Sequence, residues 1–237
     1  VLFMRTAAII PAFNEAESLP DVLVEIQQIF PEHLIIVVDD GSTDKTPEIA
    51  KKFDCVCLSL PFNLGIGGAL RLGFRYCKEN KIDRAYQFDA DGQHNPTQIA
   101  LLLSELEKAD MVIGSRFSGE HSYEIGHSRK TAMSVLRFLV RVYTRQKFTD
   151  TSSGFRGFRS PVIELFAEEY PLEYMDSVEA ILIAVKNGFN VVEIPVQMRE
   201  RSAGQPSNRN FRLLYYFLRL LIVIFVGSRK KMKGNAQ

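Results

Sequence analysis

The sequence is poor in cysteine. Its 237 residues contain three cysteines, an odd number, and their positions do not have the spacing of a metal site. Cys55, Cys57 and Cys77 are therefore expected to be thiols in a reducing compartment. No basic segment followed by an apolar core precedes the first predicted strand, so no secretory signal is expected there. A cytoplasmic location fits both observations.

The sequence also lacks an excess of charge of one sign. Lys and Arg number 29 and Asp and Glu 28, which gives a formal net charge of +1 at pH 7. Nucleic-acid-binding domains usually carry a strong positive charge or a basic face. We therefore expect no nucleic-acid partner, and any basic surface must be local.

The apolar run at residues 213–226 is too short to cross a bilayer, because a spanning helix needs roughly 20 apolar residues. It is interrupted by Arg219, which shares one helical face with Arg212 and Tyr216. Residues 211–237 are therefore predicted to form an amphipathic helix at an anionic membrane surface. The alternative is a helix packed on its own domain or on a second copy of the chain.

No internal repeat, low-complexity tract or Pro/Gly-rich linker divides the rest of the chain, so residues 1–210 are expected to form one domain. Apolar runs alternate there with stretches of helical periodicity. This alternation predicts an α/β fold with a mostly parallel sheet covered by helices on both faces. Strands are predicted at 6–13, 34–40, 55–60, 84–91, 110–116 and 190–200, with a further strand entered from the loop "TDTSSGFRGF". Helices are predicted at 15–30, 44–53, 65–80, 96–108, 128–147 and 176–187.

Polar clusters follow four of the predicted strands. In sheets of this kind, functional groups lie outside the carboxyl ends of the strands, so these clusters are expected to meet at one edge, the rim. They read Pro11-Ala12-Phe13-Asn14-Glu15, Asp39-Asp40-Gly41-Ser42, Asp89-Ala90-Asp91 and Gly114-Ser115-Arg116.

Asp89 and Asp91 are the sharpest candidates on this rim. If the strand continues past Ala90, both carboxylates point to the same side. Two adjacent anions repel each other unless a cation lies between them, and Mg²⁺ or Mn²⁺ held by few protein oxygens suits that position. Gln93 would add a neutral oxygen. The alternative is that Asp-Ala-Asp-Gly is only a turn.

The acidic pair Asp39 and Asp40 also has two interpretations. It precedes a Gly-Ser turn, so either carboxylate could simply cap or shape that turn. A carboxylate on the rim could instead accept hydrogen bonds from the ribose or the base of a nucleotide. The glycines of "NLGIGGALRLG" lack the spacing of the known phosphate-binding loops and indicate only a helix N-terminus.

Several strings, taken in order, resemble the family 2 glycosyltransferases of GT-A fold. They are "IIPAFNEAESL", "VVDDGSTDKT", "NLGIGGAL", "FDADGQHNP", "GSRF" and "TDTSSGFRGF". Within that family, the sequence is most similar to the dolichol- or polyprenol-phosphate mannose and glucose synthases. The resemblance covers residues 6 to about 208. It implies inverting, metal-dependent transfer of a hexose from a nucleotide sugar to a polyprenyl phosphate.

The resemblance also implies roles for individual residues on the donor side. Around the base and ribose it places Pro11, Phe13, Asn14, Glu15 and Asp40, with Phe13 where the family often has Tyr. Asp89, Asp91 and Gln93 match the motif that holds Mg²⁺ or Mn²⁺ against the diphosphate, and Asp89 could also contact the ribose. Arg116 and Arg129 match arginines that contact phosphates.

On the acceptor side, the resemblance points to the loop that contains Asp150, Ser153 and Arg156. Glu179 matches a further acidic position, and "RERSAGQPS" matches an Arg-x-x-Gly-x-Ser pattern. The match is imperfect there, because Gln205 and Pro206 separate Gly204 from Ser207, and the role of Ser207 is in doubt.

Physical argument assigns the chemistry among these residues. Charge that builds on the leaving diphosphate is best neutralised by the cation on Asp91 and by Arg116. A phosphomonoester acceptor is already mostly anionic at neutral pH, so it needs basic groups such as Arg129 and Arg201 more than a base. Asp150 is expected to orient one of these two arginines or to bind sugar hydroxyls, and a role as general base ranks below both. His94 is assigned no role.

The donor expected first is UDP-glucose or UDP-N-acetylglucosamine, with GDP-mannose behind them. The expected location is the inner face of the cell membrane, with a membrane protein or a second copy of the chain as partner. Two alternatives remain open: a family 2 transferase that extends a glycan on a non-lipid acceptor, and a regulatory module that only binds nucleotide sugars.

Overall fold

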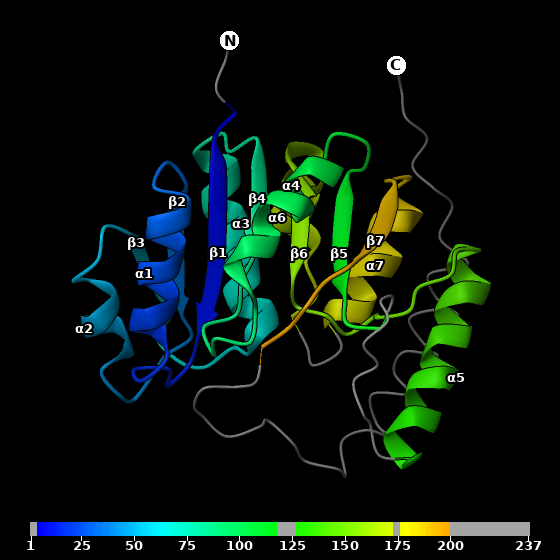
Figure 1. Cartoon of the computed structure of the whole chain (residues 1–237), viewed down its shortest axis with the longest axis horizontal. Coiled ribbons are helices and arrows are strands. Elements are labelled where there is room, and N and C mark those ends of the chain that lie inside the picture. Colours follow the sequence, from blue (N-terminus) through cyan, green and yellow to red (C-terminus); the bar gives the residue numbers. More distant parts are fainter. Residues whose placement is uncertain (1–3, 118–126, 173–175, 200–237) are drawn as a thin grey trace.

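The computed structural model describes residues 4–117, 127–172 and 176–199, and within these ranges not the side chains of 127–133 and 135. A seven-stranded sheet runs through the domain (Figure 1). Its strands are β1 (Thr6–Ala12), β2 (Leu34–Asp39), β3 (Val56–Ser59), β4 (Arg84–Gln87), β5 (Met111–Ser115), β6 (Arg156–Arg159) and β7 (Val191–Pro195). The helices are α1 (Leu19–Ile29), α2 (Thr46–Ala50), α3 (Ile66–Glu79), the short 3₁₀ turn η1 (Pro96–Gln98), α4 (Ile99–Glu105), α5 (His127–Thr144), α6 (Ser160–Glu169) and α7 (Asp176–Lys186).

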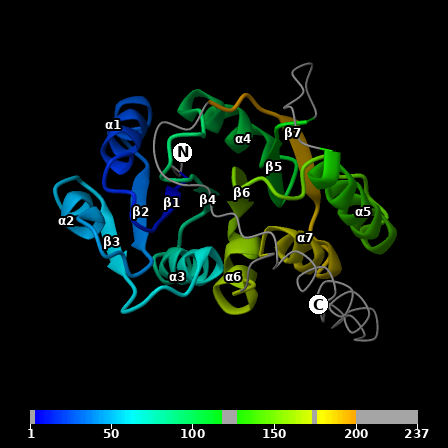
Figure 2. The same cartoon turned by 90° about the horizontal axis from the view of Figure 1, so that it is seen from below.

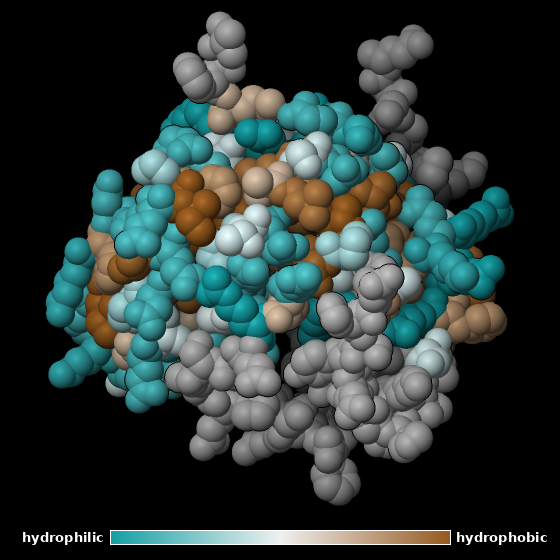
Figure 3. Space-filling view, in the orientation of Figure 1, coloured by the Kyte–Doolittle hydropathy of each residue, from teal (hydrophilic) through white to brown (hydrophobic). Residues whose placement is uncertain are grey.

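Helices cover both faces of the sheet, as predicted. Viewed along the strands in Figure 2, α1 and α4 lie on one face, and α3, α6 and α7 lie on the other. Successive strand residues point to opposite faces, so β1 sends Ile9 into the core under α3 and Ile10 into the core under α1. On the face that carries α1 and α4, apolar residues gather in a band across the upper middle of the surface, with polar residues above and below it (Figure 3).

The strand order is β3-β2-β1-β4-β6-β5-β7. The chain winds outward from β1 in one direction and from β4 in the other, so the order reverses between these two strands. In open α/β sheets, ligands bind outside the carboxyl ends of the strands at such a reversal. The predicted α/β fold with a mostly parallel sheet is confirmed, with one exception: β6 runs antiparallel to both β4 and β5.

Pro11 lies inside β1, a strand with neighbours on both sides. Along β1, the carbonyl of Ile9 accepts from Phe88 on the β4 side, and the carbonyl of Ala12 accepts from Asp40 on the β2 side. Since main-chain groups alternate sides from residue to residue, the N–H that Pro11 lacks would point toward β4. The pairing of β1 with β4 ends at Ile9 and Gln87, so no ladder hydrogen bond is lost. The two strands therefore stop bonding to each other at the reversal point.

Most predicted elements are present with shorter bounds, and two differences matter. Strand β4 ends at Gln87, and Gly92 adopts a φ of 76° in the turn that follows. Asp89 and Asp91 therefore lie beyond the strand. The alternation of a strand does not turn their carboxylates to one side, contrary to the prediction. Helix α6, which was not predicted, begins with a proline in its first turn and buries Val162, Ile163, Phe166 and Ala167.

Several predicted features lie outside the described part of the chain. These are the side chain of Arg129, residues Arg201 and Ser207, the domain boundary at 210, and the helix at 211–237. Within the described ranges, none of the helices combines the length and the apolar character needed to span a bilayer.

Candidate active site

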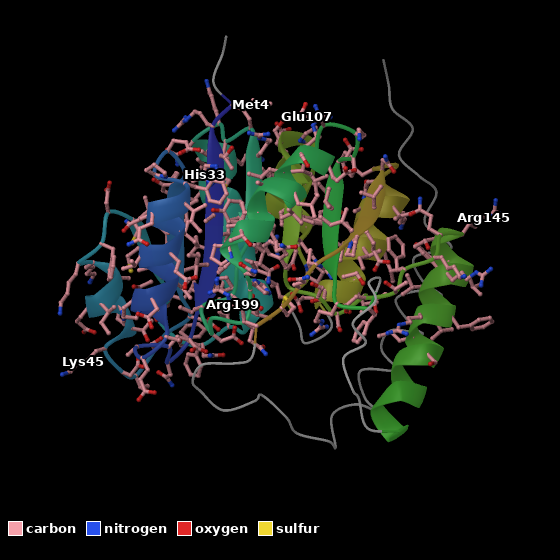
Figure 4. All side chains as sticks on the ribbon, viewed as in Figure 1. Met4, His33, Lys45, Glu107, Arg145 and Arg199 are labelled. Carbon is pink, nitrogen blue, oxygen red and sulfur yellow. The ribbon has the colours of Figure 1, made fainter. Side chains whose placement is uncertain are left out.

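The predicted polar clusters do meet on one rim of the sheet. The parallel strands β1, β2, β4 and β5 end there, and the antiparallel β6 begins there, so the loop at 149–155 joins the same rim (lower end of the sheet in Figure 1). Arg199, which follows β7, lies at this end, whereas Met4, His33 and Glu107 lie at the opposite end (Figure 4). Residues far apart in sequence are thus assembled in one place.

The carboxylate of Asp89 is held by its neighbours and stays partly accessible. Its Oδ1 accepts a hydrogen bond from Gln87 Nε2 at 3.2 Å, and 32% of its side chain is exposed. The main chain of Gly154, in the 149–155 loop, lies directly against it. A Cβ added to Gly154 would come within 2.8 Å of Asp89 Oδ2, so only glycine fits beside this carboxylate.

His94 supports Asp89 from inside the protein. Its ring is buried, with Nδ1 accepting the main-chain N–H of Asp89 at 2.9 Å and Nε2 lying 3.3 Å from Asp89 Oδ2. Because Nδ1 accepts, the proton of the neutral ring must be on Nε2, facing the carboxylate. Burial between Phe88 and Phe155 lowers the pKa of His94, and the charges of Asp89 and Asp91 oppose that shift.

The second carboxylate lies in the turn. Asp91 Oδ1 accepts the N–H of Gln93 at 3.0 Å, and the carbonyl of Gln93 accepts the N–H of Arg199 at 2.8 Å. The Arg199 guanidinium in turn binds both carboxylate oxygens of Glu25 in α1, at 3.0 and 2.7 Å. The turn is therefore tied to the segment that follows β7.

This turn suits an oxygen-ligated divalent cation. Two carboxylates and one amide oxygen are donors that Mg²⁺ and Mn²⁺ accept, and such a small set leaves positions for water and phosphate. The charges of both carboxylates act on His94, and Asp89 Oδ2 lies 3.3 Å from its Nε2. Among the described residues, no group of three or more His, Cys, Asp or Glu side chains could enclose a metal. A cation held by Asp89, Asp91 and Gln93 stays a prediction.

The acidic pair after β2 organises two neighbouring loops. Asp39 Oδ1 accepts the N–H of Ser42, while the buried Asp40 accepts the N–H groups of Leu64 and Gly65 at 2.7 and 2.8 Å. Burial raises the pKa of Asp40, and these hydrogen bonds oppose the shift. Both carboxylates therefore accept main-chain N–H groups of loops, as the interpretation that they cap or shape a turn predicted. A nucleotide contact by Asp40 stays a prediction.

The residues after β1 are tied to the same region. Asn14, at a φ of 55°, donates its main-chain N–H to Ser42 Oγ, and its side-chain oxygen accepts the N–H of Thr43 at 2.8 Å. Glu15 Oε2 accepts from Ser18 at the start of α1. Phe13 is 43% exposed beside them, so its ring remains available to stack on a ligand. Pro11 is partly buried in β1.

Arg116 and Asp150 form a bidentate ion pair. Arg116 Nε lies 2.7 Å from Asp150 Oδ2 and Nη2 lies 2.9 Å from Oδ1, and the Arg116 N–H also donates to Oδ2. Asp150 is fully buried, whereas the Arg116 side chain is 26% exposed. Burial alone would raise the pKa of Asp150, but the hydrogen bonds and charge of Arg116 outweigh it and lower that pKa. A buried carboxylate of low pKa orients an arginine better than it accepts a proton.

The rest of the 149–155 loop is held from inside. Arg156 is fully buried and donates to the carbonyls of Ser153, Ser177 and Thr151 at 2.7, 2.8 and 3.2 Å. Ser153 is also buried, and its Oγ accepts the N–H of Phe155. Glu179, in α7, is also buried. Contacts of Ser153 with an acceptor stay a prediction.

Comparison with known proteins identifies the family. Residues 7–166 match the pattern described as Glycosyl transferase family 2. The chain belongs to glycosyltransferase family 2. This glycosyltransferase is 34% identical to the undecaprenyl-phosphate mannosyltransferase of Micrococcus luteus, over 85% of this chain and 86% of that protein. It is 32% identical to the polyprenol monophosphomannose synthase of Mycolicibacterium smegmatis, over 84% and 79%.

A third relative carries another sugar in its name. The UDP-N-acetylglucosamine–dolichyl-phosphate N-acetylglucosaminyltransferase of Methanococcus voltae is 29% identical over 90% of this chain and 94% of that protein. Among solved structures, the glucosyl-3-phosphoglycerate synthase of Mycobacterium tuberculosis, in complex with Mn²⁺, UDP and phosphoglyceric acid, superposes with a TM-score of 0.71. That match has 18% identity and covers 98% of this chain and 80% of that one. It confirms the GT-A fold of the glycosyltransferase.

Sequence reasoning missed residues that shape this site, among them His94 and Gly154. His94 was assigned no role, although its place inside "FDADGQHNP" was a signal. Gly154 was seen only as part of a loop, because its contact with Asp89 joins residues that are distant in the sequence.

Proposed function

We propose that this glycosyltransferase moves a hexose from a nucleotide sugar to a polyprenyl phosphate, with inversion at the anomeric carbon. The observation that carries the proposal is the acceptor named in its relatives. Undecaprenyl phosphate, polyprenol and dolichyl phosphate are all long isoprenoid lipids, and two of these relatives match over more than four fifths of both chains. Such acceptors reside in membranes, so we place the reaction at the inner face of the cell membrane.

For the sugar, we propose mannose first and N-acetylglucosamine second. Two of the three relatives are named for mannose and one for N-acetylglucosamine, and none of the three is named for glucose. This order differs from the one favoured by the sequence, which put UDP-glucose and UDP-N-acetylglucosamine ahead of GDP-mannose.

The donor's diphosphate would lie over the Asp89–Gln93 turn. Asp89, Asp91 and Gln93 would hold Mg²⁺ or Mn²⁺, which when bound supplies positive charge to the departing diphosphate. Asp89 would keep a fixed orientation, because Gln87 and His94 both hold it. Pro11, Phe13, Asn14, Glu15 and Asp40 would line the base and ribose.

Arg116 would stabilise the negative charge that develops on the leaving phosphate. Its bidentate pair with Asp150 fixes the guanidinium before the ligand arrives, so little reorganisation is needed during the reaction. The acceptor phosphate is already anionic near neutral pH, so it would attack without prior loss of a proton. Arg129, Arg201 and Ser153 would bind this phosphate.

The decisive experiment is a donor and acceptor screen. GDP-mannose, UDP-N-acetylglucosamine and UDP-glucose would each be offered with Mg²⁺ or Mn²⁺ to a polyprenyl phosphate, in vesicles and as a short-chain soluble analogue. We expect transfer to the lipid phosphate from GDP-mannose, with α-to-β or β-to-α inversion visible by NMR. Transfer only to a glycan acceptor, or binding of the donor without turnover, would refute the proposal.

Asp91→Ala should abolish metal-dependent transfer while leaving the fold intact, because it removes a proposed metal ligand that lies in a partly exposed turn. We expect at least a roughly hundredfold loss of rate, in line with the loss of one electrostatic group from an active site. Thermal denaturation should give nearly the wild-type Tm. A near-normal rate would remove Asp91 from the metal site.

A further inference from the structure

Glu193 lies within β7, where a charged residue is unusual for a strand. Its Oε2 accepts the main-chain N–H of Thr149 at 2.6 Å, and its Oε1 accepts the N–H of Asp150 at 2.7 Å. The hydroxyl of Thr149 also contacts Oε2, at 3.1 Å. Both oxygens of one carboxylate thus hold two successive amides of the 149–155 loop.

These contacts continue directly into the Arg116 ion pair. The main chain that Glu193 holds belongs to Asp150, whose carboxylate binds the Arg116 guanidinium through both oxygens. Ser115, the residue before Arg116, also reaches the loop, because its Oγ lies 2.7 Å from Thr149 Oγ1. Strands β5 and β7 pair in parallel with Ile113 opposite Glu193, so the whole arrangement spans two neighbouring strands.

The burial of Asp150 makes the Glu193 contacts important. Asp150 is fully buried, so its N–H would lose a charged acceptor without gaining a water molecule if Glu193 were removed. The main chain would then shift to find another acceptor, and the carboxylate of Asp150 would move with it. Because Arg116 is held through that carboxylate, its guanidinium would lose its fixed position.

We propose that Glu193 is a positioning residue for Arg116, acting through the main chain and the carboxylate of Asp150. The residue has no contact with a substrate in this scheme. Its effect on activity rests on the proposed role of Arg116 in holding a phosphate, whereas its effect on the position of Arg116 does not depend on that role.

The first measurement follows Arg116 itself. In a ¹⁵N-resolved NMR spectrum, the Arg116 Nε–Hε signal should be protected from exchange with water, because that N–H donates to a buried carboxylate. Glu193→Gln replaces one acceptor oxygen with an NH₂ group that faces another donor. We expect Arg116 Hε to exchange at least about tenfold faster in this variant, the change that follows from losing one charge-assisted hydrogen bond. Unchanged exchange would overturn the proposal.

The second measurement follows phosphate binding. Affinity for GDP and for UDP, each with Mn²⁺, should fall roughly tenfold in Glu193→Gln, because the guanidinium is less well placed. In an Arg116→Ala background the same substitution should have no further effect, since both changes remove one interaction. Additive losses would instead indicate a general structural role and would count against the proposal.

Glu164→Gln is the matched control. It is the same chemical change, made at an exposed position of α6. It should leave both the Arg116 signal and nucleotide affinity as in the wild type. If the wild-type protein binds neither nucleotide, the proposed function fails, while the exchange of Arg116 Hε still decides the role of Glu193.

Discussion

Asp89 is constrained from three directions at once. Gln87 donates to its carboxylate, the ring of His94 binds its main chain, and Gly154 packs against its oxygens. A carboxylate with a fixed orientation loses little freedom when it binds a cation, so a supporting set of this kind favours precise metal geometry. It also means that the position of Asp89 depends on the 149–155 loop, although that loop is more than 60 residues away in the sequence.

The first prediction is that Gly154→Ala lowers activity by displacing Asp89. The new Cβ would lie 2.8 Å from Asp89 Oδ2 and 3.0 Å from Gln87 Nε2, closer than van der Waals contact allows. We expect the metal concentration needed for half-maximal transfer to rise at least about tenfold, since one ligand loses its position. A titration of activity with Mn²⁺ measures this concentration.

Gly188→Ala is the control for that prediction. Gly188 has a φ of 84° and open space where a Cβ would lie, so alanine there strains the main chain without touching the rim. It should cost about 1 kcal/mol of stability and leave the metal requirement unchanged. An equal change of metal requirement in both variants would contradict the contact with Asp89.

Among the elements, the end of β2 and the start of α3 behave as one unit. Asp40 holds the two amides that precede the helix, and a Cβ on Gly41 would lie only 2.6 Å from the main chain of Phe62. In "NLGIGG", Gly67 serves close packing, because a Cβ there would meet the carbonyl of Pro171. Asp40 thus fixes the loop that begins α3 against the rim.

The second prediction concerns Asp40→Asn. The amide keeps one acceptor but turns an NH₂ group toward a main-chain N–H, so one charge-assisted hydrogen bond is lost. We expect the free energy of unfolding to fall by about 1–3 kcal/mol. The amides of Leu64 and Gly65 should also exchange faster with solvent. Unchanged exchange, or an equal effect of Asp54→Asn on the exposed surface, would contradict this account.

The sequence predicted the elements better than their ends and their connections. The alternation of apolar and helical stretches predicted the strands of the parallel sheet, and the polar clusters after them predicted the rim. The antiparallel direction of β6 could not be predicted, because nothing in its four residues indicates which strands it pairs with. The sequence placed Asp89 and Asp91 on a strand, whereas they lie in a turn that Gly92 closes. Glycine is also found at the ends of strands, so its presence did not distinguish the two cases.

The sequence predicted residues of the candidate site, but not the residues that hold them in position. Asp89, Asp91, Arg116 and Asp150 lie on the rim. The arginines expected to pair with Asp150 (Arg129 and Arg201) lie outside the described side chains, and among the described residues Asp150 pairs with Arg116. Glu193, Gly154 and His94 act through contacts between distant segments, and periodicity in a single sequence does not reveal such contacts.

For the molecule as a whole, buried histidines make stability depend on pH. Burial lowers the pKa of His33; Glu32 opposes this shift and Arg84 adds to it. Above about pH 6.5, His33 is neutral in both the folded and the unfolded chain. As the pH falls below that value, the unfolded chain takes up a proton that the folded chain resists, so folding stability decreases.

The third prediction is that His33→Phe flattens this dependence. Phenylalanine preserves stacking on Phe30 and does not titrate, although it loses the contact with Tyr86. Between pH 6.5 and 5, the wild-type free energy of unfolding should fall more steeply than that of the variant, by at most about 1.4 kcal/mol per pH unit. Urea denaturation at several pH values gives both slopes. Asp40 and Asp176, whose pKa values burial raises, titrate with the opposite sign in both proteins.

Equal slopes in the two proteins would contradict the prediction, because His33 would then take up its proton equally in both states. His94 titrates with the same sign as His33 and is present in both proteins, so the difference between the slopes reports His33 alone.

The contact of Arg199 with Glu25 and with the carbonyl of Gln93 has a consequence for how the protein is made. During synthesis, the Asp89–Gln93 turn leaves the ribosome about 100 residues before the segment that anchors it, several seconds at ordinary rates of translation. Arg116 likewise leaves the ribosome about 80 residues before Glu193. Contacts between such distant segments close late and slow the folding of a chain. The contacts that complete the rim can therefore form only after β7 and Arg199 have been added.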